Sequence, residues 1–142
     1  MADFKNFSFK NLNVIYGIDE IEGFADGDDV VTIELDNDQF AKIVGAKGDV
    51  TRTQTTDNSC TITIKLLQTS KSNAVLMALY NTDRETGAGV LPLIINDKET
   101  GESHVVNNAW IMKAPNIVRG GNPNTMDWIF QGDFLTSVIP TV

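Results

Sequence analysis

The sequence has very few of the residues that most often carry out chemistry, with one cysteine, Cys60, and one histidine, His104. A single cysteine excludes a disulfide within the chain, and its place in an apolar strand pattern predicts a buried residue. A lone histidine in a predicted strand is far more often structural than catalytic. The sequence alone leaves a Cys60–His104 dyad open. No local signature supports that dyad, because Cys60 lies in mid-strand and not at a helix N-terminus, where a thiolate is favoured.

Basic residues are also scarce. The chain has 11 lysines and arginines against 19 aspartates and glutamates, so its formal net charge is −8. Few and scattered bases do not make the electrostatic footprint of a nucleic-acid-binding protein. The run Gly45-Ala46-Lys47-Gly48 is too short to cradle phosphates, and neither a dinucleotide fingerprint nor a nucleophile elbow occurs. We therefore expect no cofactor and no enzyme activity.

Long hydrophobic runs are missing as well. No apolar run approaches the length that is needed to cross a membrane. The first residues, Met1–Lys5, lack the basic segment and the apolar block of a secretion signal. From these two absences we expect a protein that is made and folded in a cytoplasm and has no membrane partner.

The acidic residues are unevenly placed. Residues 1–46 hold ten acidic and three basic residues, whereas residues 47–142 hold nine and eight. A surface formed by the acidic first third of the chain would repel phosphates within about 8 Å at physiological salt. Acidic surfaces also aid solubility, so the charge alone does not indicate a function. The turn Asp26–Asp29 resembles part of a calcium loop but lacks the further ligands, so we expect no metal site. A carboxylate pair for glycoside hydrolysis stays a weaker hypothesis, because carboxylates on one strand–turn–strand segment are usually solvated.

The residues that are present predict one β-rich domain over residues 1–142, long enough for a proper core. In Ser59–Gln68, apolar and polar residues alternate, which is typical of a half-buried strand. A polar strand over Val50–Thr56 precedes it, joined by a turn at Asp57-Asn58. A helix is predicted over about 72–81, where either nearby serine can cap the first amides. Its apolar stripe consists of Val75, Leu76, Leu79 and Tyr80.

Further strands are predicted along the rest of the chain. In the last of them, Met126, Trp128 and Phe130 share one face. About seven to nine strands with one helix and short connections indicate a β-rich α+β domain. The ranges of these further strands are 30–35, 40–44, 90–95, 103–114 and 126–131. Alternation over residues 7–17 indicates either a further strand or a well-anchored N-terminal arm.

The strand Val50–Thr56 stands out because it is rich in β-branched residues yet polar on both faces. One interpretation is an ordinary edge hairpin in solvent. The other is a strand that pairs or packs with something outside the chain. The sequence leaves both interpretations open.

A series of moderate matches runs along most of the chain, over Gly45–Arg52, Cys60–Leu66, Gln68–Asn73, Leu76–Leu79, Leu91–Asp97, Ala109–Pro115 and Asp127–Phe130. In this order they resemble the tail tube proteins of contractile-tailed bacteriophages, to which type VI secretion tube proteins are related in fold. The resemblance implies a β-sandwich or barrel-like protomer with one flanking helix. It also implies that six subunits join their sheets into a ring, and that rings stack into a hollow tube through which viral DNA passes.

The same resemblance implies where subunits meet. Gly45, Lys47, Gly48 and Arg52 belong to a segment that family members use between rings or subunits. The N-terminal arm (1–11) and the C-terminal tail (136–142) are further expected contacts. An acidic lumen lets DNA pass without specific binding, because lysine and arginine contacts are what make DNA binding tight. The candidate acids are Asp26, Asp28, Asp29, Asp36 and Asp38.

The resemblance also implies partners, and other functions stay open beside it. The implied partners are further copies of the chain, the tail sheath, the baseplate and the tail terminator, and the implied location is the virion, after assembly in the host cytoplasm. Another tail or baseplate protein, a secretion-tube subunit and a monomeric acidic binding module stay open. A tube protein oligomerises and carries long edge strands or arms, a monomeric module does not, and an enzyme has a deep pocket with perturbed carboxylates.

Overall fold

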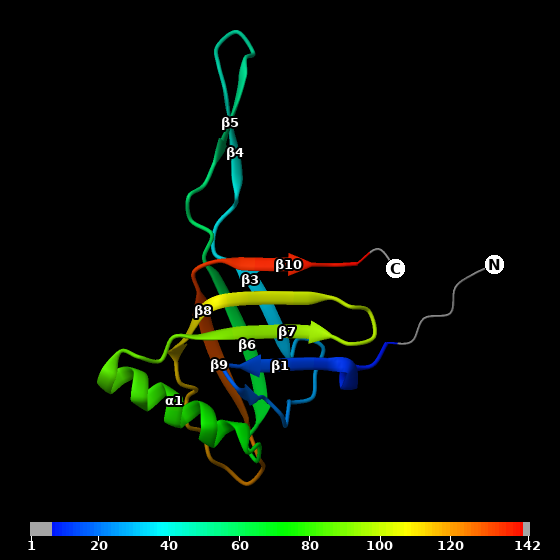
Figure 1. Ribbon diagram of the computed structural model, residues 1–142, viewed down its shortest axis with the longest axis vertical. Helices are drawn as coiled ribbons and strands as arrows, with labels where there is room; N and C mark the ends of the chain where they lie inside the picture. Colours follow the sequence, from blue (N-terminus) through cyan, green and yellow to red (C-terminus); the bar gives the residue numbers. More distant parts are fainter. Residues whose placement is uncertain (1–6, 141–142) are drawn as a thin grey trace, which may run out of the picture.

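The fold consists of one helix and ten strands in the computed structural model, which describes residues 7–140 (Figure 1). A short 3-10 helix, η1 (Phe9–Asn11), leads into the first strand. The single α-helix is α1 (Ser72–Thr86). The strands are β1 (Leu12–Tyr16), β2 (Asp19–Glu20), β3 (Val31–Leu35), β4 (Phe40–Val44), β5 (Val50–Gln54), β6 (Cys60–Leu67), β7 (Leu91–Asp97), β8 (Ser103–Lys113), β9 (Thr125–Gly132) and β10 (Leu135–Val138). The expected β-rich α+β class is confirmed.

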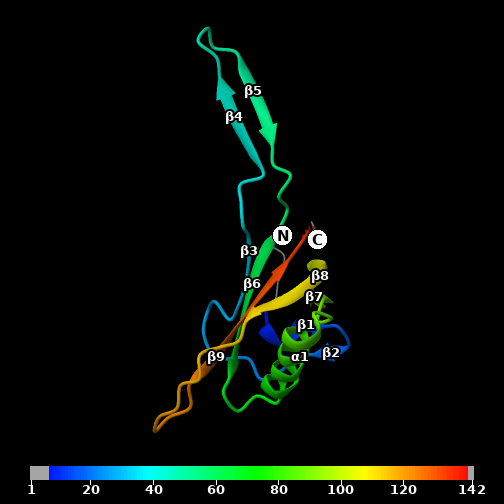
Figure 2. The same ribbon diagram turned by 90° about the vertical axis from the view of Figure 1, so that its left-hand side faces the viewer.

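Eight strands form one antiparallel sheet in the order β2-β1-β7-β8-β9-β6-β3, with β10 paired to β8. The long strand β8 joins two layers, because residues 103–106 lie between β7 and β10 whereas residues 109–113 lie beside β9. Strands β1, β7, β8 and β10 consequently run across β3, β6 and β9 (Figures 1 and 2). Residues 23–25 also bond to the end of β6, since Phe24 forms a bridge with Leu66. This contact partly closes the sandwich into a barrel.

The core lies between these layers and follows the predicted alternation. In β6 the side chains of Cys60, Ile62, Ile64 and Leu66 are buried, and those between them are half-buried. Each fully buried aliphatic or aromatic side chain of this kind contributes about 1.5–3 kcal/mol. The predicted apolar face of β9 is also confirmed, with these buried residues: Met126, Trp128 and Phe130.

The helix α1 covers one end of the sandwich, and its N-terminus is tied to two other segments. The Ser70 hydroxyl accepts a hydrogen bond from the Ser72 N–H at 3.2 Å, as expected of a nearby serine. The Ser72 hydroxyl in turn accepts from the Glu22 N–H at 2.8 Å. Further along, the Trp128 Nε1–H donates to the Asn73 amide oxygen at 2.9 Å.

The helix differs from the prediction in its length and in one face residue. It continues past Asn81 to Thr86 and ends at Gly87, whose left-handed φ of 72° suits a residue without a side chain. The polar residues 82–86 form the last turn of the helix and not a loop; four of them are exposed, and the half-buried Asp83 carboxylate accepts a hydrogen bond from the Gly89 N–H at 2.9 Å. Leu76 is buried as expected, but Val75 is 38% exposed, so its place in the apolar stripe was wrong.

Two strand predictions are also corrected. The strand β5 pairs with β4 and not with β6, because β6 already has β3 on one side and β9 on the other. The N-terminal strand begins at Leu12 and not at residue 7, because the Ser8 hydroxyl accepts from the Lys10 N–H and starts the turn of η1. Alternation alone did not distinguish this anchored turn from a strand.

Candidate assembly surfaces

Strands β4 and β5 form a hairpin that projects from the body of the domain (Figures 1 and 2). They make a separate two-stranded sheet in antiparallel register. Gly45, Lys47 and Gly48 lie in the turn at its tip, and Arg52 lies on β5. The structure therefore brings together, on one protruding element, the four residues that the resemblance implicates in subunit contacts.

Backbone hydrogen bonds close the five-residue turn at the hairpin tip. The Gly45 N–H donates to the Asp49 carbonyl at 2.7 Å, and the Gly48 N–H donates to the Gly45 carbonyl at 3.0 Å. Gly48 has a φ of 91°, which side-chain-bearing residues rarely adopt. A Cβ at Gly48 would meet no atom within 4 Å, so the need for glycine there is conformational and not steric.

Apolar side chains of the hairpin are exposed. All ten residues of its two strands are exposed. The exposed fraction of its large apolar residues ranges from 51% to 65%. An isolated two-stranded hairpin is marginally stable in water, and clustered exposed apolar residues mark interaction surfaces. The hairpin is therefore the strongest candidate for contact with another subunit in the part of the chain that the structure describes. Its large exposed apolar residues are Phe40, Ile43, Val44 and Val50.

The hairpin also carries unpaired positive charge. The Arg52 guanidinium carbon lies 4.6 Å from the centre of the Phe40 ring. Lys42 is the direct cross-strand partner of Arg52, and like charges in that position repel. Among residues 7–140, neither of these two bases nor Lys47 forms an ion pair. A hairpin with three bases thus projects from a strongly acidic chain.

Two aspartates hold the neck that joins the hairpin to β3 and β6. The Asp36 carboxylate accepts hydrogen bonds from the Ser59 hydroxyl at 2.8 Å and from the Thr61 hydroxyl at 2.6 Å. The Ser59 hydroxyl also lies 2.7 Å from Asp57, so its single proton is shared between the two carboxylates, and the Ser59 N–H donates to Asp57 at 3.0 Å. These bonds hold the pKa of Asp57 below its usual range. The neck is thus fixed by local polar contacts, which orient the hairpin relative to the sandwich.

The five acids that were assigned to an acidic surface are divided between the two ends of β3. Asp29 forms an ion pair with Lys65 at 2.9 Å, and this hydrogen-bonded partner lowers the pKa of Asp29. The five therefore do not form one continuous face in this chain, and a lumenal position stays a prediction for each of them. Three precede the strand and two follow it: Asp26, Asp28, Asp29, Asp36 and Asp38.

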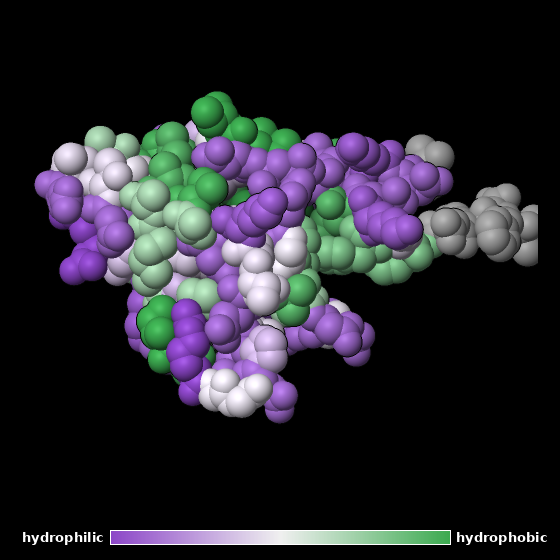
Figure 3. Space-filling model, turned by 90° about the horizontal axis from the view of Figure 1, so that it is seen from below, coloured by the Kyte–Doolittle hydropathy of each residue, from purple (hydrophilic) through white to green (hydrophobic). Residues whose placement is uncertain are grey.

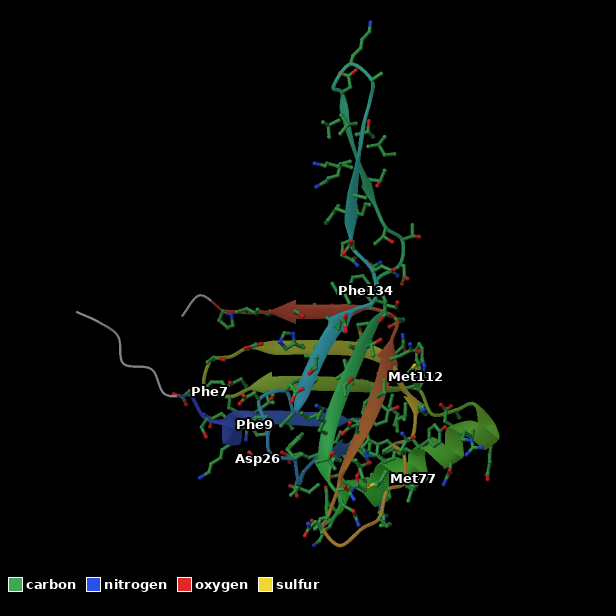
Figure 4. The ribbon with its side chains drawn as sticks, turned by 180° about the vertical axis from the view of Figure 1, so that it is seen from behind. Phe7, Phe9, Asp26, Met77, Met112 and Phe134 are labelled. Carbon is green, nitrogen blue, oxygen red and sulfur yellow. The ribbon has the colours of Figure 1, made fainter. Side chains whose placement is uncertain are left out.

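Strand β10 was missed by the sequence analysis, which treated residues 136–142 as a tail. Residues 135–138 pair instead with residues 103–106 of β8, while residues 141–142 lie outside the described part. Strands β10 and β3 each have one hydrogen-bonded neighbour in the described sheet, so each presents a free edge. Phe134, just before β10, is 54% exposed and lies at the base of the hairpin (Figure 4).

His104 has a structural role at this edge. Its Nδ1 lies 2.7 Å from the Ser137 hydroxyl of β10, and its Nε2 lies 2.6 Å from a Glu102 carboxylate oxygen. The thiol of Cys60 is buried in the core, and burial raises its pKa, which disfavours the thiolate. Cys60 and His104 are not hydrogen-bonded to each other, so the dyad is not formed.

The N-terminal segment lines a groove of about 450 Å³. Its residues Phe7, Phe9 and Asp26 lie along one side of the body, beside β1 (Figure 4). Phe7 and Phe9 contribute to the groove from the N-terminal side, and residues 25–31 from the other. Phe9 packs edge-to-face on Phe24, with ring centres 5.1 Å apart. Residues 1–6 of the predicted arm lie outside the described residues. Elsewhere the lower face carries hydrophilic residues interspersed with small hydrophobic groups (Figure 3).

Other kinds of site are not found in the described residues. Within 7–140, no three histidine, cysteine or carboxylate side chains gather as a metal-binding group would. No helix in that same range is long and apolar enough to cross a membrane. The candidate assembly surfaces are the hairpin, the free edges of β3 and β10, and the N-terminal groove.

Comparison with known proteins identifies the family. Residues 4–137 match the family of the bacteriophage PhiTE tail tube protein. The chain belongs to this tail tube family. A curated relative, structural protein ORF10 of Pseudomonas phage KPP10, is 32% identical over 113 residues. That alignment covers 78% of this chain and 65% of the relative, so the chain spans less than two-thirds of the relative's length.

Solved structures of contractile injection systems share the fold. The cap of the anti-feeding prophage, a tube-terminating cap, matches with a TM-score of 0.66 and 15% identity, over 99% of this chain and 95% of that chain. The sheath/tube terminator of the extracellular contractile injection system PVC matches with a TM-score of 0.67 and 13% identity, over 96% of this chain and 99% of that chain. A chain of the PVC sheath–tube complex matches with a TM-score of 0.64 and 13% identity, over 95% of this chain and 93% of that chain. At identities this low, these matches show a common fold alone.

Family membership confirms the resemblance to tail tube proteins that the sequence carries. It makes the chain a structural protein of a phage tail and not an enzyme. The hydrolase hypothesis for the acidic residues is therefore wrong. The carboxylates between Asp19 and Asp38 have to be explained by folding, solubility or assembly.

Proposed function

We propose that this tail tube family protein forms hexameric rings, and that these rings stack into a hollow tube through which viral DNA passes during infection. The observation that carries the proposal is the β4–β5 hairpin, which exposes apolar side chains far from its own core. Such a hairpin is marginal alone and gains stability when it packs on another subunit.

The sheet edges supply a second kind of contact, for ring closure. Strands β3 and β10 each have one neighbour in the described sheet. Joining free edges of adjacent subunits closes the sheet and removes edges that otherwise aggregate. The N-terminal arm and the residues after β10 extend these contacts around the single domain. The net charge of −8 favours a channel to which DNA does not adhere, because lysine and arginine contacts are what bind phosphates.

The proposed partners follow from the systems in which the similar folds occur. One similar structure is a sheath–tube complex and another is a sheath/tube terminator. By analogy of fold, the tube of this protein contacts a sheath along its outside, a terminator at one end and a baseplate at the other. The protein then resides in the virion, after assembly in the host cytoplasm.

A tube terminator is the second candidate function. Two of the similar structures are a cap and a terminator, and they match over at least 95% of both chains. A terminator forms one ring and stops, whereas a tube subunit adds ring after ring. The two functions therefore differ in whether assembly continues as the concentration rises.

The test is negative-stain electron microscopy of the purified protein across a concentration series, with light scattering on the same samples. We expect hollow tubes that lengthen with concentration, and single rings at every concentration indicate the terminator. The same measurements are made on a variant in which a short glycine–serine linker replaces residues 40–54. We expect it to keep the circular-dichroism spectrum of the sandwich but to form no tubes. A wild-type protein that stays monomeric throughout contradicts both functions.

A further inference from the structure

We propose that the tip of the β4–β5 hairpin docks into the N-terminal groove of a second copy of this chain in the adjacent ring. The proposal rests on the proposed tube function and identifies the surface that receives the hairpin. It is argued from the chemistry of the groove, the chemistry of the hairpin and the positions of the two in the molecule.

The groove combines an apolar wall with unpaired acids. Phe7, Phe9 and Leu12 line one side, and Val31 lines the other. Its volume of about 450 Å³ is large enough to accept several side chains of a hairpin tip. Asp26 and Asp28 also line the groove, and neither forms an ion pair among the described residues. The groove therefore suits an apolar segment that carries positive charge.

The hairpin has this composition. Val44 and Val50 are direct cross-strand partners next to the turn, and they are 55% and 65% exposed. On the same face, Lys42 and Arg52 form the pair two positions away, because side chains alternate along each strand. Lys47 lies in the turn itself. Docking thus buries two valines against aromatic side chains and brings these bases to carboxylates that have no cation in their own chain.

The positions of the two surfaces favour stacking. The hairpin extends from one end of the domain, whereas Phe7, Phe9 and Asp26 lie together along one side of the body, below its junction with the hairpin (Figure 4). A hairpin that points away from its own groove cannot fill it within one chain. A contact between two different surfaces is heterologous, and it repeats from subunit to subunit without closing on a pair. Repetition along one axis is what a stack of rings requires.

Site-directed cross-linking tests this contact. The variant V50C/D28C carries one cysteine on the hairpin and one at the groove, while the native Cys60 is 0% exposed and stays unreactive. Assembled protein is treated with a short bifunctional maleimide and separated on a denaturing gel. We expect a ladder of multimers. The matched control V50C/E85C places the second cysteine on the exposed C-terminal part of α1 and is expected to give no ladder.

A charge exchange provides the second readout. D26K/D28K is expected to raise the concentration needed for tube formation by about tenfold or more, because like charges then face each other. Adding Lys42→Glu and Arg52→Glu to that variant is expected to restore most of the loss.

The outcomes separate the two proposals. Wild-type tubes in which V50C/D28C gives no ladder and D26K/D28K assembles normally overturn the docking contact and leave the tube function standing. Cross-linking that occurs only after removal of residues 1–6 also overturns it, because it assigns the groove to the chain's own N-terminal segment. Failure of the wild type to form rings or tubes overturns the tube function, and the docking contact with it.

Discussion

At the scale of single residues, Tyr16 on β1 combines a buried aromatic ring with a hydrogen-bonded hydroxyl. Its side chain is 1% exposed, and its ring packs edge-to-face on Phe130 with centres 5.0 Å apart. The hydroxyl lies 2.9 Å from the Gly89 carbonyl oxygen and 3.0 Å from that of Ala109, and its single proton is shared between them. These contacts tie β1 to the segment just before β7 and to the middle of β8.

Burial raises the pKa of Tyr16 from 10.0 to about 12, with a smaller contribution from the charge of Asp83. The folded state therefore holds the phenol proton more tightly than the unfolded state. Its contribution to stability is complete below pH 10 and is lost as the pH rises toward 12. We expect the free energy of unfolding, measured with urea, to fall between pH 10 and pH 12.

The matched variant Tyr16→Phe removes the titrating group but keeps the ring. It is expected to lower stability at pH 8 by about 1–3 kcal/mol, because two buried carbonyls lose their donor. It is also expected to flatten the decline above pH 10. A variant whose stability falls as steeply as that of the wild type would show that other groups cause the alkaline loss.

At the scale of elements, the helix α1 shows how a sequence pattern identifies a helix but not its packing. Leu76 is 1% exposed, whereas Val75, its neighbour in the predicted stripe, is 38% exposed. Leu79, Tyr80 and Met77 are half-buried against the core. The face that packs on the sandwich is therefore centred on Leu76 and includes Asn73 through its bond to Trp128.

The substitution Leu76→Ala is expected to cost roughly 2–5 kcal/mol, because it leaves a cavity between α1 and the sheet. Val75→Ala is the control on the exposed side, and we expect a change below about 0.5 kcal/mol there. Both values come from urea denaturation followed by tryptophan fluorescence, since Trp128 lies against the helix. Equal effects of the two substitutions would mean that the helix is rotated relative to the sheet.

At the scale of the whole molecule, the distribution of charge separates the hairpin from the body. Within β4, β5 and the turn between them lie three bases and one acid, whereas the whole chain carries a net charge of −8. Subunits of like net charge repel one another, and a basic element on an acidic body gives them a complementary contact. Assembly is thus expected to depend on hairpin charge more than on total charge.

The variant Arg52→Glu tests this expectation. It lowers the net charge by two and also removes the contact of Arg52 with the Phe40 ring. We expect the concentration needed for tube formation to rise by about tenfold, with little change in melting temperature, because Arg52 is exposed. Arg119→Glu makes the same change in net charge on an exposed loop and is expected to assemble normally. If both variants lost assembly equally, total charge would be the cause.

The sequence by itself determined the local features of this protein. Alternating apolar residues in Ser59–Gln68 and around Trp128 fixed which side of each strand faces the core, because side-chain direction has a period of two. The helical spacing of Leu76 and Leu79 located the helix, and composition excluded a disulfide within the chain. The ordered matches along the chain identified the tail tube family. Each of these depends on residues that are close in sequence or on composition.

Only the tertiary structure decided which elements meet. It paired β5 with β4 as a projecting hairpin, placed β10 on the edge of β8 and divided the acids between the two ends of β3. It also brought Phe9 and Asp28 to one groove. Strand pairing depends on competition among distant edges for the same backbone hydrogen bonds, and β3 and β9 occupy both edges of β6. Local periodicity contains no information about that competition.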